Sequence, residues 1–551
     1  MTIMQEPTTL DVAIGEFALD PDRFSGVSIS EIVRHWSETI PDRTAFITPT
    51  SRISWAQYDA AADAIASALE LSSEGYGHVA VLLPDTMVFH AALCAAYRTG
   101  RVAVGIGSRS GLREISHLIE RSDATVLVTT RSLRGVDTTE LISQLRQAHP
   151  TLDVVFADDT GAVSFERAAA VGGVVSLPVP KRVFEASSPT FSTAAVSMLN
   201  STSGTTGLPK LVTQTEDRWV AFSEIGAEAA DVGPEEVFLG AVPAPFGFGL
   251  WTSHFLPALL GAPNVVMERF DVAVMIDLIE REGVTVLNCV STQFKMLLRS
   301  DAAASANLDT LRVMFTGGEA VPYSEALAFE ERTGAAVLQF YGSNETGAVS
   351  VTTVEDDSDT RLRTCGHVID RMQVRVFDDA ATEVVGSMRR GQPAVNGPLM
   401  CQGYWGDVDA NNELYTEDGW MLLGDIVEID EDGRVRVVGR KADIIIRGGK
   451  NISAVEVEEY VRAHPLVDLV AAVGVDDALF GEKVCAVVVT TDSEALSAAE
   501  LTEWMREQGI TREYIPEYVM TLAELPMAAG GKVAKGAVKE LVREKLAEAI
   551  C

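Results

Sequence analysis

The sequence predicts an α/β protein, and two observations support that prediction. Between about residues 28 and 330, amphipathic helical segments alternate with short apolar segments that have the character of buried strands. The composition, with 47% hydrophobic residues and 44 glycines among 551 residues, is typical of a globular enzyme. Alternation of this kind favours parallel sheets covered by helices. A chain of this length exceeds what one hydrophobic core supports, so we expect more than one domain.

The first part of the chain supplies the alternating elements. Their apolar residues recur either with the period of a helix or as short continuous runs. Expected helices cover residues 53–71, 86–97, 251–260 and 293–298, and expected strands cover 78–84, 102–106, 196–199, 237–242, 284–288, 311–315 and 336–340.

After about residue 365 the pattern changes to strands separated by Gly/Asp turns. Asp432-Gly433 stands between two alternating runs over residues 427–438, which is a strong hairpin signal. A further compact unit follows, with expected helices at 454–463, 498–508 and from Lys535, and expected strands at 469–475 and 484–490. Its length of roughly 110 residues is enough for a small α+β domain. We therefore place one domain at 1–438 and a second at 439–551.

Charge and cysteine usage exclude several classes of function. The 79 acidic residues outnumber the 44 basic ones and give a formal net charge of −35, which argues against binding to nucleic acid or to anionic membranes. The six cysteines include no C-x-x-C pair and the eight histidines no H-E-x-x-H spacing, so we expect reduced thiols and no zinc site. The N-terminus lacks a signal-peptide pattern and no apolar run reaches bilayer length. These features predict a cytoplasmic protein.

The segment from Ser201 to Lys210, STSGTTGLPK, is the first candidate for chemistry. Its hydroxyls and backbone N–H groups can donate to phosphate oxygens, its glycines permit close approach, and Lys210 adds a cation. Because the strand at 196–199 precedes it, we expect this loop to leave the edge of a sheet. Leu211 follows Lys210 where a Walker A loop has Ser or Thr, so it is not that motif. An ordinary polar surface loop is the alternative.

Four further segments and a fifth near the C-terminus carry residues suited to catalysis. Glu345 follows the strand at 336–340, at the carboxyl end where open α/β sheets bind ligands. The five segments are Thr316–Glu319, Tyr341–Gly347, Gly424–Asp425, Gly439–Lys450 and Pro526–Lys532. Taken singly, each is more often a turn or a solvated charged loop than a functional site. Their order and spacing together form a specific signature.

With these motifs, the chain resembles the adenylate-forming superfamily of acyl- and aryl-CoA synthetases, adenylation domains of nonribosomal peptide synthetases, and firefly luciferase. The resemblance runs from about Ile29 to Leu541. It implies a large N-terminal domain of parallel sheets with covering helices plus a small β-barrel, and a small mobile α+β C-terminal domain. It also implies a reaction in two halves: ATP-dependent formation of an acyl-adenylate with release of pyrophosphate, then transfer to a thiol.

The resemblance implies a role for each motif. Lys532, Glu345 and Lys210 are the expected catalytic residues, with Lys532 bridging the substrate carboxylate and the α-phosphate; its neighbour Lys535 is expected to face solvent. Glu345 and Thr205 are the expected ligands of Mg²⁺. The expected ATP- and AMP-binding residues are Thr202, Ser203, Gly204, Thr205, Thr206, Gly207, Lys210, Gly317, Gly318, Glu319, Tyr341, Gly342, Ser343, Asn344, Asp425 and Arg440.

The same resemblance predicts how the thiol reaches the adenylate. The C-terminal domain is expected to rotate about a hinge at Ala442, so that Arg447, Gly448 and Gly449 line a tunnel for a pantetheine thiol. We expect coenzyme A as the acceptor, with a carrier protein in trans as the alternative. A homodimer is a candidate oligomeric state.

The acid pocket is predicted from the segment Pro245 to Trp251. Amino-acid-activating relatives place an aspartate where this chain has Gly247, and dihydroxybenzoate-activating relatives tend to have asparagine there. Since Gly247 cannot pair a buried ammonium, we expect an aromatic, alicyclic or medium-chain acid without an α-amine. The expected pocket residues are Phe246, Gly247, Trp251, Gly317, Ser291 and Gln293, although Phe248 and Trp251 are equally consistent with core aromatics.

Several positions depart from the family pattern. Ala442 stands where Lys or Asp is usual, Asn344 and Leu423 where Thr is usual, and Ala528 and Gly530 where hydroxyls are common. None of these changes removes a charged group that performs the chemistry, so we expect an active enzyme. A catalytically silent nucleotide sensor is the remote alternative, a luciferase-like oxygenase has no support in the sequence, and a phosphotransferase lacks its catalytic loop.

Overall fold

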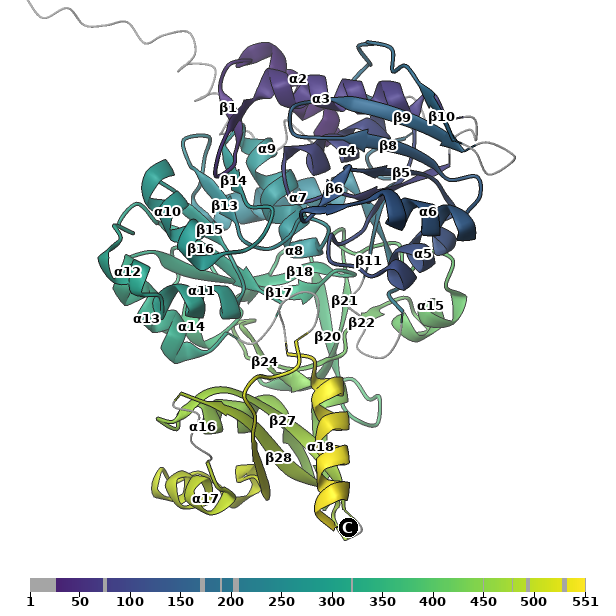
Figure 1. The fold of residues 1–551 in the computed structure, drawn as a ribbon. Coiled ribbons are helices and arrows are strands. Elements are labelled where there is room, and N and C mark those ends of the chain that lie inside the picture. The colour runs from purple at the N-terminus through teal and green to yellow at the C-terminus, as the bar shows by residue number, and fades with distance from the viewer. Residues whose placement is uncertain are drawn as a thin grey trace, which may run out of the picture. The chain divides into compact units, whose positions relative to one another are not determined.

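The computed structural model of the chain describes residues 26–72, 77–168, 174–188, 191–201, 208–318, 321–448, 450–477, 479–491, 496–527 and 533–550 (Figure 1). These residues form two compact units. The first comprises the described residues of 1–202, 208–362 and 397–414, and the second those of 363–396 and 415–551. The boundary predicted after residue 438 falls within a strand of the second unit and stays a prediction.

One sheet of the first unit ends at the predicted phosphate loop. Its strand order is β10-β9-β8-β5-β3-β4-β11-β12, and the five central strands from β8 through β5, β3 and β4 to β11 run parallel to one another. The strands are β3 (His78–Leu82), β4 (Ala103–Gly105), β5 (Ala124–Thr129), β8 (Asp153–Ala157), β9 (Val163–Ala168), β10 (Val174–Leu177), β11 (Val196–Ser201) and β12 (Leu211–Thr215). β11 pairs antiparallel with the edge strand β12, so the two strands that flank the predicted phosphate loop lie at one edge of the sheet, as predicted.

A second sheet of the same unit presents the loop that carries Glu345. Its order runs β18-β17-β16-β15-β13-β14-β1-β2, and the strands from β1 through β14, β13, β15 and β16 to β17 are parallel. The strands are β1 (Thr44–Ile47), β2 (Arg52–Ser54), β13 (Phe238–Gly240), β14 (Asn264–Val266), β15 (Val286–Asn288), β16 (Val313–Gly317), β17 (Ala336–Ser343) and β18 (Gly347–Val351).

Helices cover both sheets, as the alternation predicts. They are α2 (Ile29–Thr39), α3 (Trp55–Leu69), α4 (Met87–Arg98), α5 (Leu112–Arg121), α6 (Thr139–Ala148), α7 (Glu216–Ala230), α8 (Gly247–Gly249), the π-helix η2 (Leu250–Phe255), α9 (Leu256–Leu260), α10 (Val272–Glu282), α11 (Ser291–Leu298), α12 (Asp301–Ser305), α13 (Tyr323–Thr333), α14 (Ser358–Arg363) and α15 (Val408–Leu414); a small ribbon joins β6 (Ser132–Leu133) to β7 (Val136–Asp137). Ser28 and Ser54 cap α2 and α3 through capping boxes.

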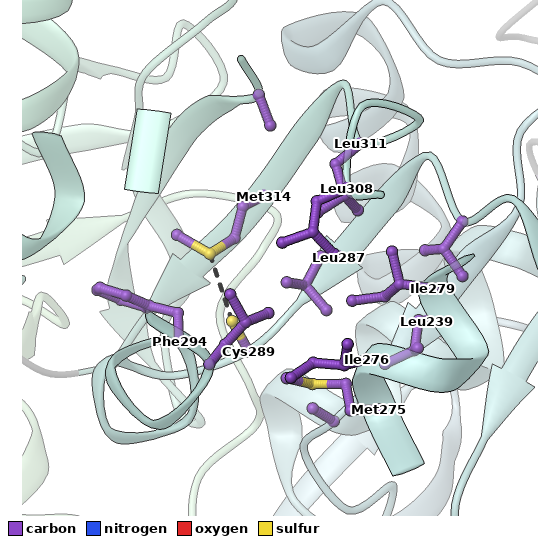
Figure 2. Close-up of a cluster of buried hydrophobic side chains, with 14 of the residues drawn as sticks. Leu239, Met275, Ile276, Ile279, Leu287, Cys289, Phe294, Leu308, Leu311 and Met314 are labelled. Carbon is purple, nitrogen blue, oxygen red and sulfur yellow. Dashed lines mark hydrogen bonds between the residues drawn. The ribbon is translucent and has the colours of Figure 1, made fainter. Parts of the chain in front are cut away.

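A cluster of buried apolar side chains forms the core beneath the second sheet (Figure 2). Leu239, Leu287 and Met314 from neighbouring strands face Ile276 and Ile279 of α10 there. The thiol of Cys289 lies 3.3 Å from the sulfur of Met314 inside this cluster. Packing at this density holds the carboxyl ends of β13, β15 and β16 in fixed positions, and the predicted acid-pocket and adenine segments begin there.

The second unit contains two further sheets. The antiparallel order β20-β21-β23-β24, with β22 beside β21, uses β20 (Gln373–Phe377), β21 (Arg389–Asn396), β22 (Met421–Leu422), β23 (Asp425–Ile429) and β24 (Val435–Arg440); β19 (His367–Val368) precedes them. The predicted Asp432-Gly433 turn joins β23 to β24, with Gly433 at φ +80°. Closure of this sheet into a barrel stays a prediction.

The other sheet has helices on both faces. Its order is β26-β25-β28-β27, with β29 parallel to β28. The elements are the 3-10 helices η3 (Lys441–Asp443) and η4 (Arg512–Tyr514), the strands β25 (Ile444–Arg447), β26 (Lys450–Ser453), β27 (Val467–Asp477), β28 (Gly481–Thr490) and β29 (Tyr518–Thr521), and the helices α16 (Ala454–Arg462), α17 (Ala498–Glu507) and α18 (Lys535–Ile550). One apolar cluster lies under α16 and α17, and another joins β27 and β28 to α18 (Figure 1).

Candidate active site

Lys210 stands directly before β12, at the end of the predicted phosphate loop. Its side chain is exposed, and its ammonium lies 4.8 Å from the ring centroid of Tyr404, a cation–π distance. The other predicted phosphate-binding residues, Thr202 to Gly207, lie outside the described residues.

Glu345 sits in a tight turn between β17 and β18. The Ser343 hydroxyl accepts the N–H groups of Glu345 and Thr346, both at 3.2 Å, and the Thr346 hydroxyl accepts the Ser343 N–H at 2.9 Å. Local bonds of this kind fix a loop without a regular ladder. The Glu345 carboxylate is therefore held at the carboxyl end of a parallel strand, as the sequence predicts.

Tyr404 links the two charged groups. Its hydroxyl donates to Glu345 Oε1 at 2.8 Å, while its ring face receives Lys210. Burial raises the pKa of Tyr404, and the negative charge of Glu345 raises it further, so the hydroxyl stays protonated and remains a donor. A carboxylate and an ammonium are thus oriented by one side chain.

Arg218 of α7 holds the backbone beneath Glu345. The side chain is 3% exposed; its Nε donates to the Leu399 carbonyl at 2.8 Å, and its terminal nitrogens donate to the carbonyls of Asn344 at 3.3 Å and Glu345 at 3.4 Å. A buried guanidinium with carbonyl acceptors on several segments fixes their relative positions.

The carboxylate of Glu345 suits the Mg²⁺ that ATP-dependent chemistry implies. Glu345 is half-buried; Oε1 accepts from Tyr404, and no described residue donates to Oε2. Mg²⁺ is commonly bound by one or two carboxylates together with substrate phosphates, which fits a single glutamate beside a phosphate loop. In the described part of the chain no cluster of three His, Cys, Asp or Glu side chains could hold a metal ion by itself.

The predicted adenine segments lie at the ends of neighbouring strands. Gly317 is the last residue of β16, and a Cβ added to it would stand 2.5 Å from the Phe340 carbonyl oxygen on β17, so only glycine fits. Tyr341 and Gly342 lie within β17, where Tyr341 is 7% exposed. Gly318 follows at φ +76°, and Glu319 lies outside the described residues.

The predicted acid-pocket residues divide into surface and core. Phe246 and Gly247 are partly exposed at the start of α8, whereas Trp251 is fully buried and its ring stacks on Phe222 at 4.2 Å. Trp251 therefore lies in the layer beneath the segment, which is the core position that the sequence left open.

Two residues on the other predicted wall of the acid pocket belong to α11. Ser291 is 4% exposed. The Gln293 amide bonds to the backbone at both ends: its Nε2 donates to the Ala241 carbonyl at 2.6 Å and its Oε1 accepts the Val290 N–H at 3.0 Å. Gln293 thus joins β13 to the start of α11.

In the second unit, the two predicted ribose residues lie directly opposite one another. Asp425 on β23 pairs in register with Arg440 on β24, and Arg440 Nε is 3.6 Å from Asp425 Oδ1. The Arg440 side chain is 58% exposed and the Asp425 side chain 17%, so an exposed donor stands beside a largely covered acceptor.

The predicted hinge residue Ala442 lies in η3, between two residues that are tied to neighbouring segments. Lys441 donates to Gln392 Oε1 at 2.8 Å, and Asp443 lies 3.5 Å from the ammonium of Lys535. Lys535 also pairs with Glu458 at 2.8 Å and is only 21% exposed. The expectation that Lys535 faces solvent is therefore wrong, because its ammonium pairs with the carboxylates of Asp443 and Glu458.

The predicted tunnel residues occupy the turn after β25. Arg447 pairs with Glu517 at 2.7 Å, and Gly448, at φ +59°, donates its N–H to the Phe480 carbonyl at 2.7 Å. Gly449 and the predicted catalytic Lys532 lie outside the described residues.

Comparison with protein families decides the assignment. A model of the AMP-binding enzyme family matches residues 33–405, and a model of the AMP-binding enzyme C-terminal domain matches residues 456–532. The chain belongs to the AMP-binding enzyme family. It is an enzyme of the adenylate-forming, acid–thiol ligase type, as its motifs predict.

Individual members of the AMP-binding enzyme family match nearly the whole chain. The indoleacetate–CoA ligase of Aromatoleum aromaticum is 30% identical over 527 residues, covering 94% of this chain and 99% of its own. The 2,3-dihydroxybenzoate-AMP ligase of Bacillus subtilis is 28% identical over 528 residues, covering 95% of each chain.

The fold comparison agrees. The crystal structure of an anthranilate CoA ligase in complex with anthranoyl-AMP superimposes with a TM-score of 0.83 at 20% identity, covering 95% of this chain and 98% of the other. This likeness confirms the α/β fold of sheets and helices predicted from the sequence. None of the helices among the described residues has the length and apolarity needed to cross a membrane.

Sequence reasoning missed Tyr404, Arg218 and the side chains that brace Asn344. Asn200 and Gln214 lie in strands that also contain serine or threonine, VSMLNS and LVTQT, so the sequence alone does not single out these two buried amides. Tyr404 lies 59 positions from Glu345, and the local sequence around either residue does not predict their contact.

Proposed function

We propose that this enzyme activates a carboxylic acid without an α-amine and transfers it to a thiol. In the first half-reaction a carboxylate oxygen attacks the α-phosphorus of ATP, the bond to the β-phosphate breaks, and pyrophosphate leaves. In the second, the thiol sulfur attacks the acyl carbon, the bond to AMP breaks, and the thiol proton passes to solvent. Both halves require anions to be brought together, so positioned cations and dipoles carry the catalysis.

The arrangement of Lys210, Tyr404 and Glu345 supports this proposal most directly. A lysine ammonium at the end of a hydroxyl-rich loop and a carboxylate with a free oxygen are oriented by the same tyrosine. Lys210 and the residues 202–207 hold the β- and γ-phosphates. Glu345, together with Thr205, holds Mg²⁺, which neutralises phosphate charge when bound.

The remaining nucleotide contacts follow from the predicted motifs. Gly317, Gly318, Glu319 and the segment 341–344 frame the adenine, and the cross-strand pair of Asp425 and Arg440 binds the ribose, since a largely covered carboxylate can accept both hydroxyls. Lys532 bridges the carboxylate and the α-phosphate.

The acid is most consistent with an aromatic body. Gly247 offers no carboxylate to an ammonium, and Phe246 is partly exposed beside it. The two relatives described above are named for indoleacetate and 2,3-dihydroxybenzoate, both ring-bearing acids without an α-amine. Ser291, Gln293 and Trp251 complete the proposed pocket; the structure holds Gln293 by its bond to the Ala241 carbonyl and Trp251 by its stacking on Phe222.

The acceptor thiol is proposed to be that of coenzyme A, with a carrier protein in trans as the second candidate. Arg447, Gly448 and Gly449 line its path after rotation of residues 439–551 about Ala442. The side chains of Ile446 and Phe480 beside this turn are 55% and 42% exposed, a surface suited to the apolar stretch of pantetheine. We place the enzyme in the cytoplasm, where both acceptors occur.

Acid-dependent exchange of labelled pyrophosphate into ATP tests the proposal. Aromatic, alicyclic and medium-chain acids are expected to support exchange, whereas α-amino acids are not. Mass analysis of the product with coenzyme A or with a phosphopantetheinylated carrier then identifies the acceptor. ATP binding without exchange for any acid would favour the silent sensor instead.

A further inference from the structure

The space beside Gly247 is already filled. A Cβ placed on Gly247 would stand 2.5 Å from Asn344 Oδ1 and 3.5 Å from an edge carbon of Trp219. The amide oxygen of Asn344 therefore occupies the position toward which any side chain at 247 would project. A larger residue at 247 and asparagine at 344 exclude each other unless one of them shifts.

The orientation of the Asn344 amide is set by a chain of hydrogen bonds that begins at Arg218 and Trp219, whose side-chain nitrogens can only donate. Gln214 Oε1 accepts from Arg218 at 2.5 Å and from Trp219 Nε1 at 3.1 Å, so Gln214 must point its Nε2 the other way. That Nε2 donates to Asn200 Oδ1 at 2.6 Å. Asn200 is thereby fixed as well, with its own Nδ2 directed at Asn344.

Asn344 is the last member of this chain of amides. Its Oδ1 accepts from Asn200 Nδ2 at 3.0 Å and from Gln214 Nε2 at 3.3 Å, and its Nδ2 returns one bond to Asn200 Oδ1 at 3.0 Å. The second N–H of Nδ2 has no partner among the described residues. Gln214 and Asn200 are 0% and 2% exposed while Asn344 is partly exposed, so the network runs outward from the core and leaves one N–H of Asn344 Nδ2 unused at its end.

We propose that Asn344 is a specificity-determining residue for the acid, standing in for the side chain that position 247 lacks. Its free N–H donates to a hydrogen-bond acceptor that the acid carries close to its carboxylate, such as the oxygen of an ortho-hydroxyl group. That hydroxyl directs its own proton to the neighbouring carboxylate, which leaves the oxygen to accept. This proposal rests on the proposed function, which places residue 247 beside the acid.

Matched acids test the role of Asn344. Pyrophosphate exchange is measured with 2-hydroxybenzoate against benzoate, and with 2-hydroxy-1-naphthoate against 1-naphthoate. The wild-type enzyme is expected to favour the hydroxylated member by about 10-fold or more in kcat/KM, and Asn344→Ala to bring the ratio close to one, since an unpaired buried donor discriminates strongly. A ratio of rates on one enzyme is insensitive to a general loss of folding.

A second experiment moves the amide side chain from position 344 to position 247. Gly247→Asn alone is expected to lose most exchange activity, because its side chain meets Asn344, while Gly247→Asn with Asn344→Ala regains it together with the preference for the hydroxylated acid. Thermal unfolding of each variant identifies any that fail to fold. Non-additivity of this kind is the signature of two residues that share one space.

The outcomes separate the two proposals. No exchange with any acid would overturn the proposed function. Exchange with other acids but with neither matched pair would overturn the acid class named here, and an unchanged ratio in Asn344→Ala would overturn the role of Asn344 while leaving the proposed function intact.

Discussion

Tyr404 shows how one neutral side chain organises two charged ones. Its hydroxyl and its ring face serve different partners, Glu345 and Lys210, so the two functions are separable by mutation. Replacing the tyrosine by phenylalanine removes only the hydrogen bond and keeps the surface over which the ammonium lies.

We expect Tyr404→Phe to lower kcat/KM for ATP by about 10- to 100-fold, because a hydrogen bond to a charged group contributes roughly 1.5–3 kcal/mol. The measurement is pyrophosphate exchange at varied ATP and Mg²⁺. Tyr97→Phe is the matched control. The Tyr97 hydroxyl donates to the Phe191 carbonyl at 3.4 Å and makes no hydrogen bond to Glu345. Equal losses in both variants would contradict a specific role for Tyr404.

Residues that bear charge in glycine-rich or hydroxyl-rich loops could be predicted from the sequence. Lys210, Glu345, Asp425 and Arg440 all lie where strand ends or turns present them. Arg218 could not be predicted, because a buried arginine on an amphipathic helix has the same local pattern as one in a surface ion pair. Only the tertiary fold brings Leu399 and the Glu345 turn to its guanidinium.

Among the elements, the first turns of α7 and α2 meet around a buried carboxyl group, that of Glu216. Glu216 is 2% exposed, and its Oε2 has no partner among the described residues. Burial raises the pKa of Glu216 to about 8. A hydrogen bond from the Ile29 backbone lowers this pKa, and the negative charges of Glu31 and Asp217 raise it slightly. The folded protein therefore holds a proton on Glu216 that the unfolded chain releases near its ordinary pKa.

The sign of the resulting pH dependence is fixed. Below the ordinary pKa near 4.5 both states are protonated and Glu216 has no effect; as pH rises toward about 8 the unfolded state alone ionises, so stability is lost. We expect Glu216→Gln to raise the unfolding free energy relative to wild type by roughly 2–4 kcal/mol at pH 8 but by little at pH 4.5.

Denaturant unfolding at a series of pH values tests this expectation. Glu228→Gln, on the exposed face of the same helix, is the control and is expected to leave the pH profile unchanged. A difference between Glu216→Gln and wild type that did not change with pH would show that Glu216 is ionised in the folded protein.

The existence and order of the elements could be predicted from periodicity, but local backbone variants could not. The segment predicted as one helix at 251–260 is instead a π-helix followed by α9. Pro257 has no N–H to donate to the Ser253 carbonyl, and Asn264 Nδ2 takes that carbonyl at 3.1 Å. The proline was visible in the sequence, whereas the compensating amide from a neighbouring strand depends on the fold.

For the whole molecule, residues 441–443 lie in a bonded junction rather than a free linker. Lys441 bonds to Gln392, and Asp443 and Glu458 share Lys535 at the start of α18. Because Ala442 carries no charge, its neighbours Lys441 and Asp443 make the polar and charged contacts around the predicted hinge position. Lys532 lies three positions before Lys535 in the sequence, outside the described residues.

Two half-reactions that use different residues give the most informative prediction about the whole enzyme. In the proposed mechanism, Lys532 neutralises a carboxylate and an α-phosphate that must approach each other, a charge arrangement present only while the adenylate forms. We therefore expect Lys532→Ala to lower adenylate formation by about 10³-fold or more while thiolysis of supplied acyl-adenylate stays within a few-fold of wild type.

Lys539→Ala, which removes a 40% exposed partner of Glu482 farther along α18, is expected to leave both rates unchanged. Single-turnover assays of each half-reaction measure the two rates separately, and an equal fall of both in Lys532→Ala would mean that one arrangement of the chain performs both steps, with no rotation about Ala442.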